Sequence, residues 1–372
     1  SFSKMYVFMM KIPSTYSSTR FTLLHFIFLL VLSNRTNSLL KLAPNVTVPA
    51  FIAFGDSIMD TGNNNHIKTI VKCNFSPYGQ DFEGGIPTGR FCNGKNPSDL
   101  IVEYLGIKEL LPAYLDPNLK PSDLPTGVSF ASGASGYDPL TSKIVSVISM
   151  SDQLKMFKEY IVKLKDVVGE KRKNFILANT LFLVVAGSDD LANTYFTIRT
   201  PQLHYDVPAY TDLMVNEASN FVKEIYHLGA RKIGVFSAAP IGYLPSQRTL
   251  SGGLSRNINE EYNEAAKLFN SKLSKQMDYL HSSLPNSRVI YIDIYTPLLD
   301  IIIKPQKYGY KVADKGCCGT GKLEVSVLCN PLVPACDNNK EYVFWDSYHP
   351  TESVYRTLVA EVLPKYMDRL IS

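Results

Sequence analysis

Three residues near the two ends of the chain have side chains that together could perform nucleophilic catalysis. Ser57 lies in the stretch AFGDSIMDTGNNN, and Asp346 and His349 lie three residues apart in FWDSYHPTE. A serine hydroxyl is a weak nucleophile until a histidine accepts its proton, and the histidine needs a carboxylate to fix its tautomer. Each stretch alone also has an ordinary structural explanation, because a serine after a strand often caps a helix and Asp-x-x-His before a proline often forms a capping pair.

The elements that would position these residues alternate along the chain. Four near-continuous apolar segments have the length of buried strands: 49–57, 180–188, 230–240 and 287–295. Such runs are typical of strands that are buried on both faces of a parallel sheet. Ser57 therefore follows the carboxyl end of the first strand, where open α/β sheets bind their ligands.

Amphipathic segments of helical length separate the apolar runs. We predict helices within 151–169, where Ser151 or Asp152 can cap the first turn, within 209–230, where Gly229 stops the helix, and within 255–284. Strands that alternate with helices of this length indicate βαβ units and an α/β fold with right-handed crossovers.

The amino terminus has the pattern of a secretory leader. An apolar block of 12 residues, FTLLHFIFLLVL, is followed by small polar residues, and it is shorter than the roughly 20 residues of a membrane span. We therefore expect residues 1–38 to be cleaved, residues 39–372 to form one domain without a stable membrane anchor, and the protein to be secreted. The net charge of +4 comes from 38 basic and 34 acidic residues without a concentrated basic patch, which argues against a nucleic-acid partner.

The six cysteines fall into two groups, one of Cys73 and Cys92 and one at positions 317, 318, 329 and 336. In an oxidising compartment we expect disulfides that form mainly within each group. A zinc site is not expected, because adjacent cysteines without a nearby histidine make a poor tetrahedral clamp. Asn45 and Asn74 begin sequons that would accept glycans after secretion.

Several ordered blocks of the chain resemble the plant GDSL esterase/lipases of the SGNH hydrolase superfamily. The blocks are FGDSIMDTGNNN, FASGASG, VVAGSDD and DSYHPT, with further similarity in GRFCNGKNPSDLI and GCCGTG. ASGASGYDPLT and VVAGSDDLANTYF are most similar to the extracellular-lipase branch that is associated with pollen and anther coats. The resemblance implies a flavodoxin-like, three-layer α/β/α fold with about five parallel strands. It also implies that Ser57 is the nucleophile, His349 the base and then the acid, and Asp346 the carboxylate that orients His349.

The resemblance further implies an oxyanion hole with three donors: the backbone N–H of Ser57, the backbone N–H of Gly136 or else of Gly133, and the side chain at position 189. The family pattern has asparagine at the last position, but this chain has Asp189. An ionised carboxylate only accepts hydrogen bonds and would repel the developing negative charge. We therefore expect an esterase that is slow or favours acid, unless Asn193, one helical turn further, supplies an amide.

The sequence thus predicts a secreted serine esterase or lipase that hydrolyses acyl esters of lipids or small molecules in the apoplast, the cell wall or the pollen coat. Neither a metal nor an organic cofactor is implied. One alternative is an acyltransferase that uses the same acyl-enzyme with a hydroxylated acceptor. A second alternative is a catalytically weak protein that binds lipid or cell wall, which Asp189 favours and the presence of Ser57, Asp346 and His349 opposes.

Overall fold

A parallel sheet of four strands lies at the centre of the described chain, which comprises residues 48–325 and 329–371 of a computed structural model. The expected leader 1–38 and Asn45 lie outside these residues. The strands are β1 (Phe51–Gly55), β2 (Leu181–Val185), β3 (Lys232–Phe236) and β4 (Arg288–Ile292), in that order across the sheet. Each falls within one of the four predicted apolar segments, and the predicted α/β fold is confirmed.

An irregular segment, residues 128–132, runs beside the free edge of β1. The N–H of Ala53 donates to the carbonyl of Val128 at 3.3 Å, and the N–H of Phe130 donates to the carbonyl of Ala53 at 2.8 Å. Segment 128–132, which follows β1 in the chain, thus lies at one edge of β1. Strands β2, β3 and β4 follow in order from the other edge of β1. This is the strand order of flavodoxin-like sheets, with the expected fifth strand reduced to a short bridge.

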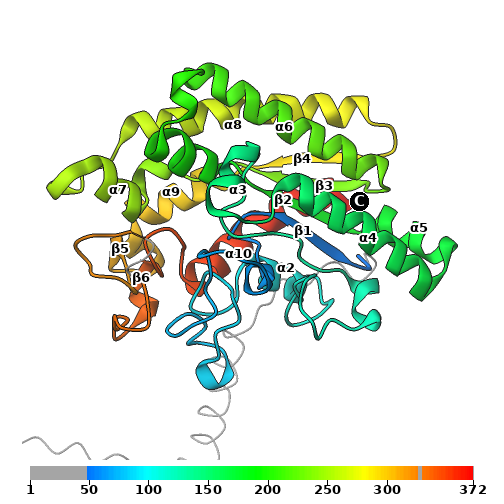
Figure 1. Ribbon diagram of the computed structural model, residues 1–372, viewed down its shortest axis with the longest axis horizontal. Coiled ribbons are helices and arrows are strands. Elements are labelled where there is room, and N and C mark those ends of the chain that lie inside the picture. Colours follow the sequence, from blue (N-terminus) through cyan, green and yellow to red (C-terminus); the bar gives the residue numbers. More distant parts are fainter. Residues whose placement is uncertain (1–47, 326–328, 372) are drawn as a thin grey trace, which may run out of the picture. The chain divides into compact units, whose positions relative to one another are not determined.

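Helices cover both faces of the sheet (Figure 1). On one face, side chains of α4 (Met150–Val168), α6 (Val207–His227) and α8 (Glu260–Ser283) pack with Ile52 and Phe54 of β1. On the other face, α2 (Pro97–Tyr104) and α10 (Glu352–Ile371) pack with Phe51 and Ala53. Successive side chains of a strand point to opposite faces, so the continuous apolar run of β1 packs against the helices on both faces of the sheet.

The three predicted helices are present, with small differences at their ends. Ser149 caps α4 by accepting a hydrogen bond from the N–H of Asp152, so neither Ser151 nor Asp152 is the cap. The chain leaves α6 through Gly229, whose φ of +113° is the left-handed conformation that favours glycine. The other α-helices in the described part of the chain are α3 (Pro139–Val145), α5 (Glu170–Asn179), α7 (Pro245–Gly252) and α9 (Tyr295–Ile303).

Two disulfides and a two-stranded sheet organise the region before α10. Strand β5 (Val312–Gly316) pairs with β6 (Tyr342–Phe344), and disulfides join Cys317 to Cys336 and Cys318 to Cys329. The predicted bonding within the carboxyl-terminal group is therefore confirmed.

The expected bond between Cys73 and Cys92 is absent, and both thiols are free and buried. The Sγ of Cys92 instead lies 3.7 Å from the carbonyl oxygen of Pro350 and 3.8 Å from that of Lys95. Burial raises the pKa of both thiols. The side chain of Cys92 thus packs as a buried thiol against backbone carbonyls. The spacing of the cysteines in the sequence does not show this environment.

Candidate active site

Ser57 lies in a tight turn at the carboxyl end of β1. The turn begins at Gly55, whose φ is +125° and where a Cβ atom would lie 1.8 Å from the carbonyl oxygen of Val185. Only glycine allows β1 to approach β2 so closely and then leave the sheet. The N–H of Asp56 completes the turn by donating to the same carbonyl at 2.9 Å. The hydroxyl of Ser57 is thereby placed at the edge of the sheet, with 9% of the residue exposed.

Asp346 and His349 occupy one turn between β6 and α10. The carboxylate of Asp346 accepts hydrogen bonds from the N–H groups of Tyr348 at 2.8 Å and His349 at 2.7 Å. The turn is closed by a bond of 2.7 Å from the N–H of Trp345 to the carbonyl of His349. The disulfide-bonded segment lies against it, because the N–H of Cys318 donates to the carbonyl of Trp345 at 2.6 Å.

The structure brings the three predicted residues into one hydrogen-bonded chain. The Nε2 atom of His349 lies 2.7 Å from the Oγ of Ser57, and its Nδ1 lies 2.8 Å from one carboxylate oxygen of Asp346 and 2.9 Å from the other. An Nδ1–H that donates to Asp346 leaves Nε2 free to accept the proton of Ser57. This is the geometry that activates a serine nucleophile.

Tyr78 adds a contact to Asp346 that was not predicted from the sequence. Its hydroxyl donates a hydrogen bond of 2.7 Å to Oδ2 of the buried Asp346. Burial raises the pKa of Asp346, but the charge of His349 and hydrogen bonds from His349 and Tyr348 outweigh burial and lower it overall. Asp346 is therefore held as a carboxylate, which is the form that orients a histidine.

The asparagines after Ser57 fix the neighbouring block of the site. Asn63 donates through Nδ2 to the carbonyls of Ser129 and Ala131, at 2.9 and 2.8 Å. Asn64 donates to the carbonyl of Gly133 at 3.1 Å. The polar stretch therefore joins the turn after β1 to the segment that continues from the edge bridge.

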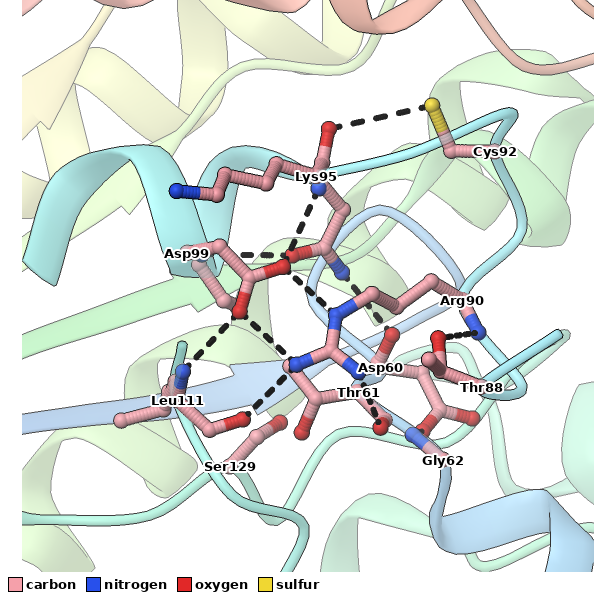
Figure 2. Close-up of polar contacts among 12 residues, drawn as sticks. Asp60, Thr61, Gly62, Thr88, Arg90, Cys92, Lys95, Asp99, Leu111 and Ser129 are labelled. Atoms are coloured by element: carbon pink, nitrogen blue, oxygen red, sulfur yellow. Dashed lines mark hydrogen bonds and ion pairs between the residues drawn. The ribbon is translucent and has the colours of Figure 1, made fainter. Parts of the chain in front are cut away.

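A buried ion pair holds the loop that follows Ser57 (Figure 2). The guanidinium of Arg90 lies 2.5 and 2.8 Å from the two carboxylate oxygens of Asp99 in α2, and the carboxylate is fully buried. Arg90 also donates to the carbonyls of Thr61 and Leu111, each at 3.1 Å. The GRFCNGKNPSDLI block thus has a structural part in holding the loop that follows Ser57.

The two glycines predicted as backbone donors, Gly136 and Gly133, are not among the residues that line the cavity with Ser57. Gly136 does not line the cavity, and a Cβ atom there would meet the carboxylate of Asp190 at 2.3 Å. The N–H of Gly133 is already bonded to Asp60 at 3.0 Å. Ala134, with a φ of +65°, lines the cavity with Ser57. Non-glycine residues seldom adopt this left-handed conformation, so the sequence does not indicate it at Ala134.

Asp189 faces the same cavity from the start of a π-helix, η4 (Asp190–Ile198). The Nδ2 of Asn193 donates to Oδ1 of Asp189 at 2.6 Å, and the Oδ1 of Asn193 accepts from the hydroxyl of Tyr348 at 2.9 Å. Burial raises the pKa of Asp189 to about 6, although the nearby His349 and the bond from Asn193 act in the opposite direction. The amide of Asn193 thus donates its hydrogen bond to Asp189. With a pKa of about 6, the carboxyl group of Asp189 is largely protonated in mild acid.

The catalytic groups lie in a largely apolar cavity of about 580 Å³. One side is formed by loops and short helices, and its apolar side chains include Val71, Phe75, Phe91 and Val145. The other side lies against β4, α9 and α10, and includes Ile294, Leu298, Leu358 and Val362. The apolar lining of the cavity therefore suits a substrate with an apolar part.

Residues 48–325 and 329–371 contain no group of three or more histidine, cysteine or acidic side chains placed to hold a metal ion. Within the same residues, no helix combines the length and the apolar character that crossing a membrane requires.

Comparisons with known proteins agree with this geometry. Residues 51–362 match the family model described as GDSL-like lipase/acylhydrolase. The GDSL esterase/lipase EXL3 of Arabidopsis thaliana is 56% identical over 358 residues, which cover 96% of this chain and 97% of that protein. The GDSL esterase/lipase EXL2 of the same plant is 48% identical over 369 residues, which cover 95% of this chain and 97% of that protein.

Proposed function

The chain belongs to the GDSL-like lipase/acylhydrolase family and is a carboxylic ester hydrolase, and from this we propose that it cleaves acyl esters of lipids or small molecules through an acyl-enzyme on Ser57. The observation that carries the proposal is the hydrogen-bonded chain from Ser57 through His349 to Asp346 at an apolar cavity. A protein that only binds lipid would have no need of this alignment.

The reaction follows from the positions of these groups. Nε2 of His349 takes the proton of Ser57 while Oγ forms a bond to the ester carbonyl carbon. The resulting imidazolium is stabilised by Asp346 and then gives its proton to the departing alcohol oxygen, which leaves the acyl group on Ser57. Water, activated by the same histidine, attacks the acyl-enzyme, and the carboxylic acid departs as Ser57 regains its proton.

We assign the negative charge of the tetrahedral intermediate to three donors. Two are the backbone N–H groups of Ser57 and Ala134, which both line the cavity and have no hydrogen-bond partner among residues 48–325 and 329–371. The third is the carboxyl group of Asp189 in its protonated form. Asn193 occupies Oδ1 of Asp189, so Oδ2 is the oxygen that carries the proton toward the substrate. This arrangement favours mildly acidic conditions, because the pKa of Asp189 is about 6.

An extracellular location in the apoplast, the cell wall or the pollen coat is part of the proposal. It is supported by the leader pattern of residues 1–38 and by two disulfides, which form and persist in oxidising compartments. A mildly acidic extracellular space would also suit the protonation of Asp189. We further propose that Asn45 and Asn74 carry glycans; Asn74 is exposed on its loop.

The test is hydrolysis of p-nitrophenyl acetate, butyrate and longer esters by the wild type, by Ser57→Ala and by Ser282→Ala. Ser282 is an exposed serine on α8 and serves as the matched control. Turnover that is lost only in Ser57→Ala supports the proposal, and turnover that persists in Ser57→Ala contradicts it. Repeating the assay with an added alcohol, and measuring the new ester, separates hydrolysis from acyl transfer.

A further inference from the structure

Three isoleucines are exposed around the entrance of the catalytic cavity. Ile70, Ile144 and Ile198 all line this cavity, and their exposed fractions are 88%, 38% and 43%. We call these three residues the apolar rim. They come from separate parts of the chain: a loop after β1, helix α3 and the π-helix η4.

Hydrogen bonds tie the three segments of the rim together. The hydroxyl of Thr69 donates to the carbonyl of Val145, at the end of α3, at 2.7 Å. The hydroxyl of Thr194 in η4 lies 2.9 Å from that of Thr141 in α3. Each bond lies within four residues of a rim isoleucine, so the three segments hold one another in place. The isoleucines nevertheless stay exposed to water, although burying an apolar side chain is favourable.

Cationic side chains accompany each part of the apolar rim. Lys68, Lys143 and Arg199 lie one or two residues from the rim isoleucines and are exposed. In the described part of the chain, none of the three forms a salt bridge. The acidic residues of the cavity wall are Asp56, Asp189 and Asp346, which belong to the catalytic end of the cavity.

We propose that the apolar rim, with these three cations, docks the protein on a lipid surface that carries anionic headgroups. Exposed apolar side chains enter the acyl boundary of such a surface, and lysine and arginine bind its headgroups. The rim is also continuous with the wall of the cavity that holds Ser57, so an acyl chain passes from the lipid layer to the nucleophile without crossing bulk water. Only this delivery step rests on the proposed function, because the docking itself needs no catalysis.

The experiment is co-sedimentation of the protein with vesicles of phosphatidylcholine, either pure or mixed with phosphatidylglycerol, at low and high salt. The wild type binds the mixed vesicles more tightly than the pure ones, and salt weakens this binding. Ile70→Ser lowers the partition coefficient about tenfold, because serine lacks most of the apolar surface that isoleucine transfers from water into the lipid. Lys68→Glu, Lys143→Glu and Arg199→Glu each lower binding to the mixed vesicles by about fivefold or more.

The matched control is Val162→Ser on α4. Val162 has 59% of its surface exposed but does not line the cavity. This variant binds vesicles like the wild type, and so does Ser57→Ala, which removes the nucleophile without touching the rim. If Ser57 proved not to be the nucleophile, the expected binding to vesicles would therefore stay the same.

Three results would overturn the docking proposal. The first is wild-type protein that does not bind the mixed vesicles, or that binds both kinds equally well. The second is equal loss of binding in Ile70→Ser and Val162→Ser. The third is a dimer in sedimentation velocity that Ile70→Ser dissociates, because the rim would then cover a second copy of the chain.

Discussion

Replacing Asp189 by asparagine should make the enzyme faster at neutral and alkaline pH while leaving its rate in acid nearly unchanged. Asparagine is close in shape to aspartate and carries an N–H₂ group at every pH, whereas aspartate donates a hydrogen bond only when protonated. Burial raises the pKa of Asp189 to about 6 in this cavity. The wild type therefore loses its third oxyanion donor as the pH rises through that value.

The size of the effect follows from this titration. With a pKa of about 6, about nine-tenths of the Asp189 side chains are protonated at pH 5, but only about one-hundredth at pH 8. The ratio of the variant's kcat/KM to that of the wild type should thus be near one at pH 5. It should grow about five- to tenfold per unit above pH 6 and reach about 50 to 90 at pH 8, because the loss of one oxyanion donor costs about 10²–10³ in rate.

The assay is kcat/KM for p-nitrophenyl butyrate between pH 5 and pH 8 for the wild type, Asp189→Asn and Asp189→Ala. The comparison uses ratios so that any pH dependence shared by the three proteins cancels. Asp189→Ala lacks a donor at every pH, so its ratio to Asp189→Asn should be low and constant. A ratio of Asp189→Asn to wild type that stays flat, or that falls below one at pH 8, would refute protonated Asp189 as an oxyanion donor.

Two further changes test groups that hold the site in place. Tyr78→Phe removes the hydroxyl that donates to Asp346 at 2.7 Å, and should lower kcat about tenfold with little change in KM, because a bond to a buried charge contributes about 1.5–3 kcal/mol. Arg90→Met leaves the buried Asp99 carboxylate unpaired, and should lower the free energy of unfolding in urea by about 3–5 kcal/mol.

Each of these changes has a control. For Tyr78→Phe the thermal midpoint should stay near that of the wild type, and a rise in KM without a fall in kcat would argue against a role in positioning Asp346. For Arg90→Met the comparison is Arg356→Met, which removes a half-exposed arginine from its pairs with Glu352 and Glu103 and should cost less than about 1 kcal/mol. Equal losses in the two arginine variants would show that the buried pair is not an anchor.

The sheet and its long helices could be predicted because their signals are local. The apolar runs around Ser57, Val184, Val235 and Ile290 fit strands that are buried on both faces, and the structure places a strand at each. The edge segment 128–132 has no such run, because it meets β1 only through a short bridge. Its place in the strand order is therefore visible only in three dimensions.

The candidate site could be predicted in part. Ser57, Asp346 and His349 stand in short stretches whose composition suggests their chemistry, and the structure joins them by hydrogen bonds. The partners of these residues carry no comparable signal. Tyr78 reaches Asp346 across 268 positions of the chain, and Ala134 depends on a backbone conformation that alanine seldom adopts.

The disulfides could also be predicted only in part. Pairing within 317–336 followed from grouping in the sequence, but Cys73 and Cys92 were grouped in the same way and remain free. Spacing places two cysteines near each other on the chain, but it does not determine the directions of their side chains, and a disulfide requires both.

The central claim is that Ser57 forms the covalent intermediate, and the most direct measurement is mass spectrometry of the protein after reaction with a fluorophosphonate that reacts with activated serines. The structure predicts one adduct, located by peptide mapping on Ser57. The adduct should be absent in Ser57→Ala and greatly reduced in His349→Ala, because the hydroxyl then has no base. An adduct on another serine, or undiminished labelling of His349→Ala, would contradict the account.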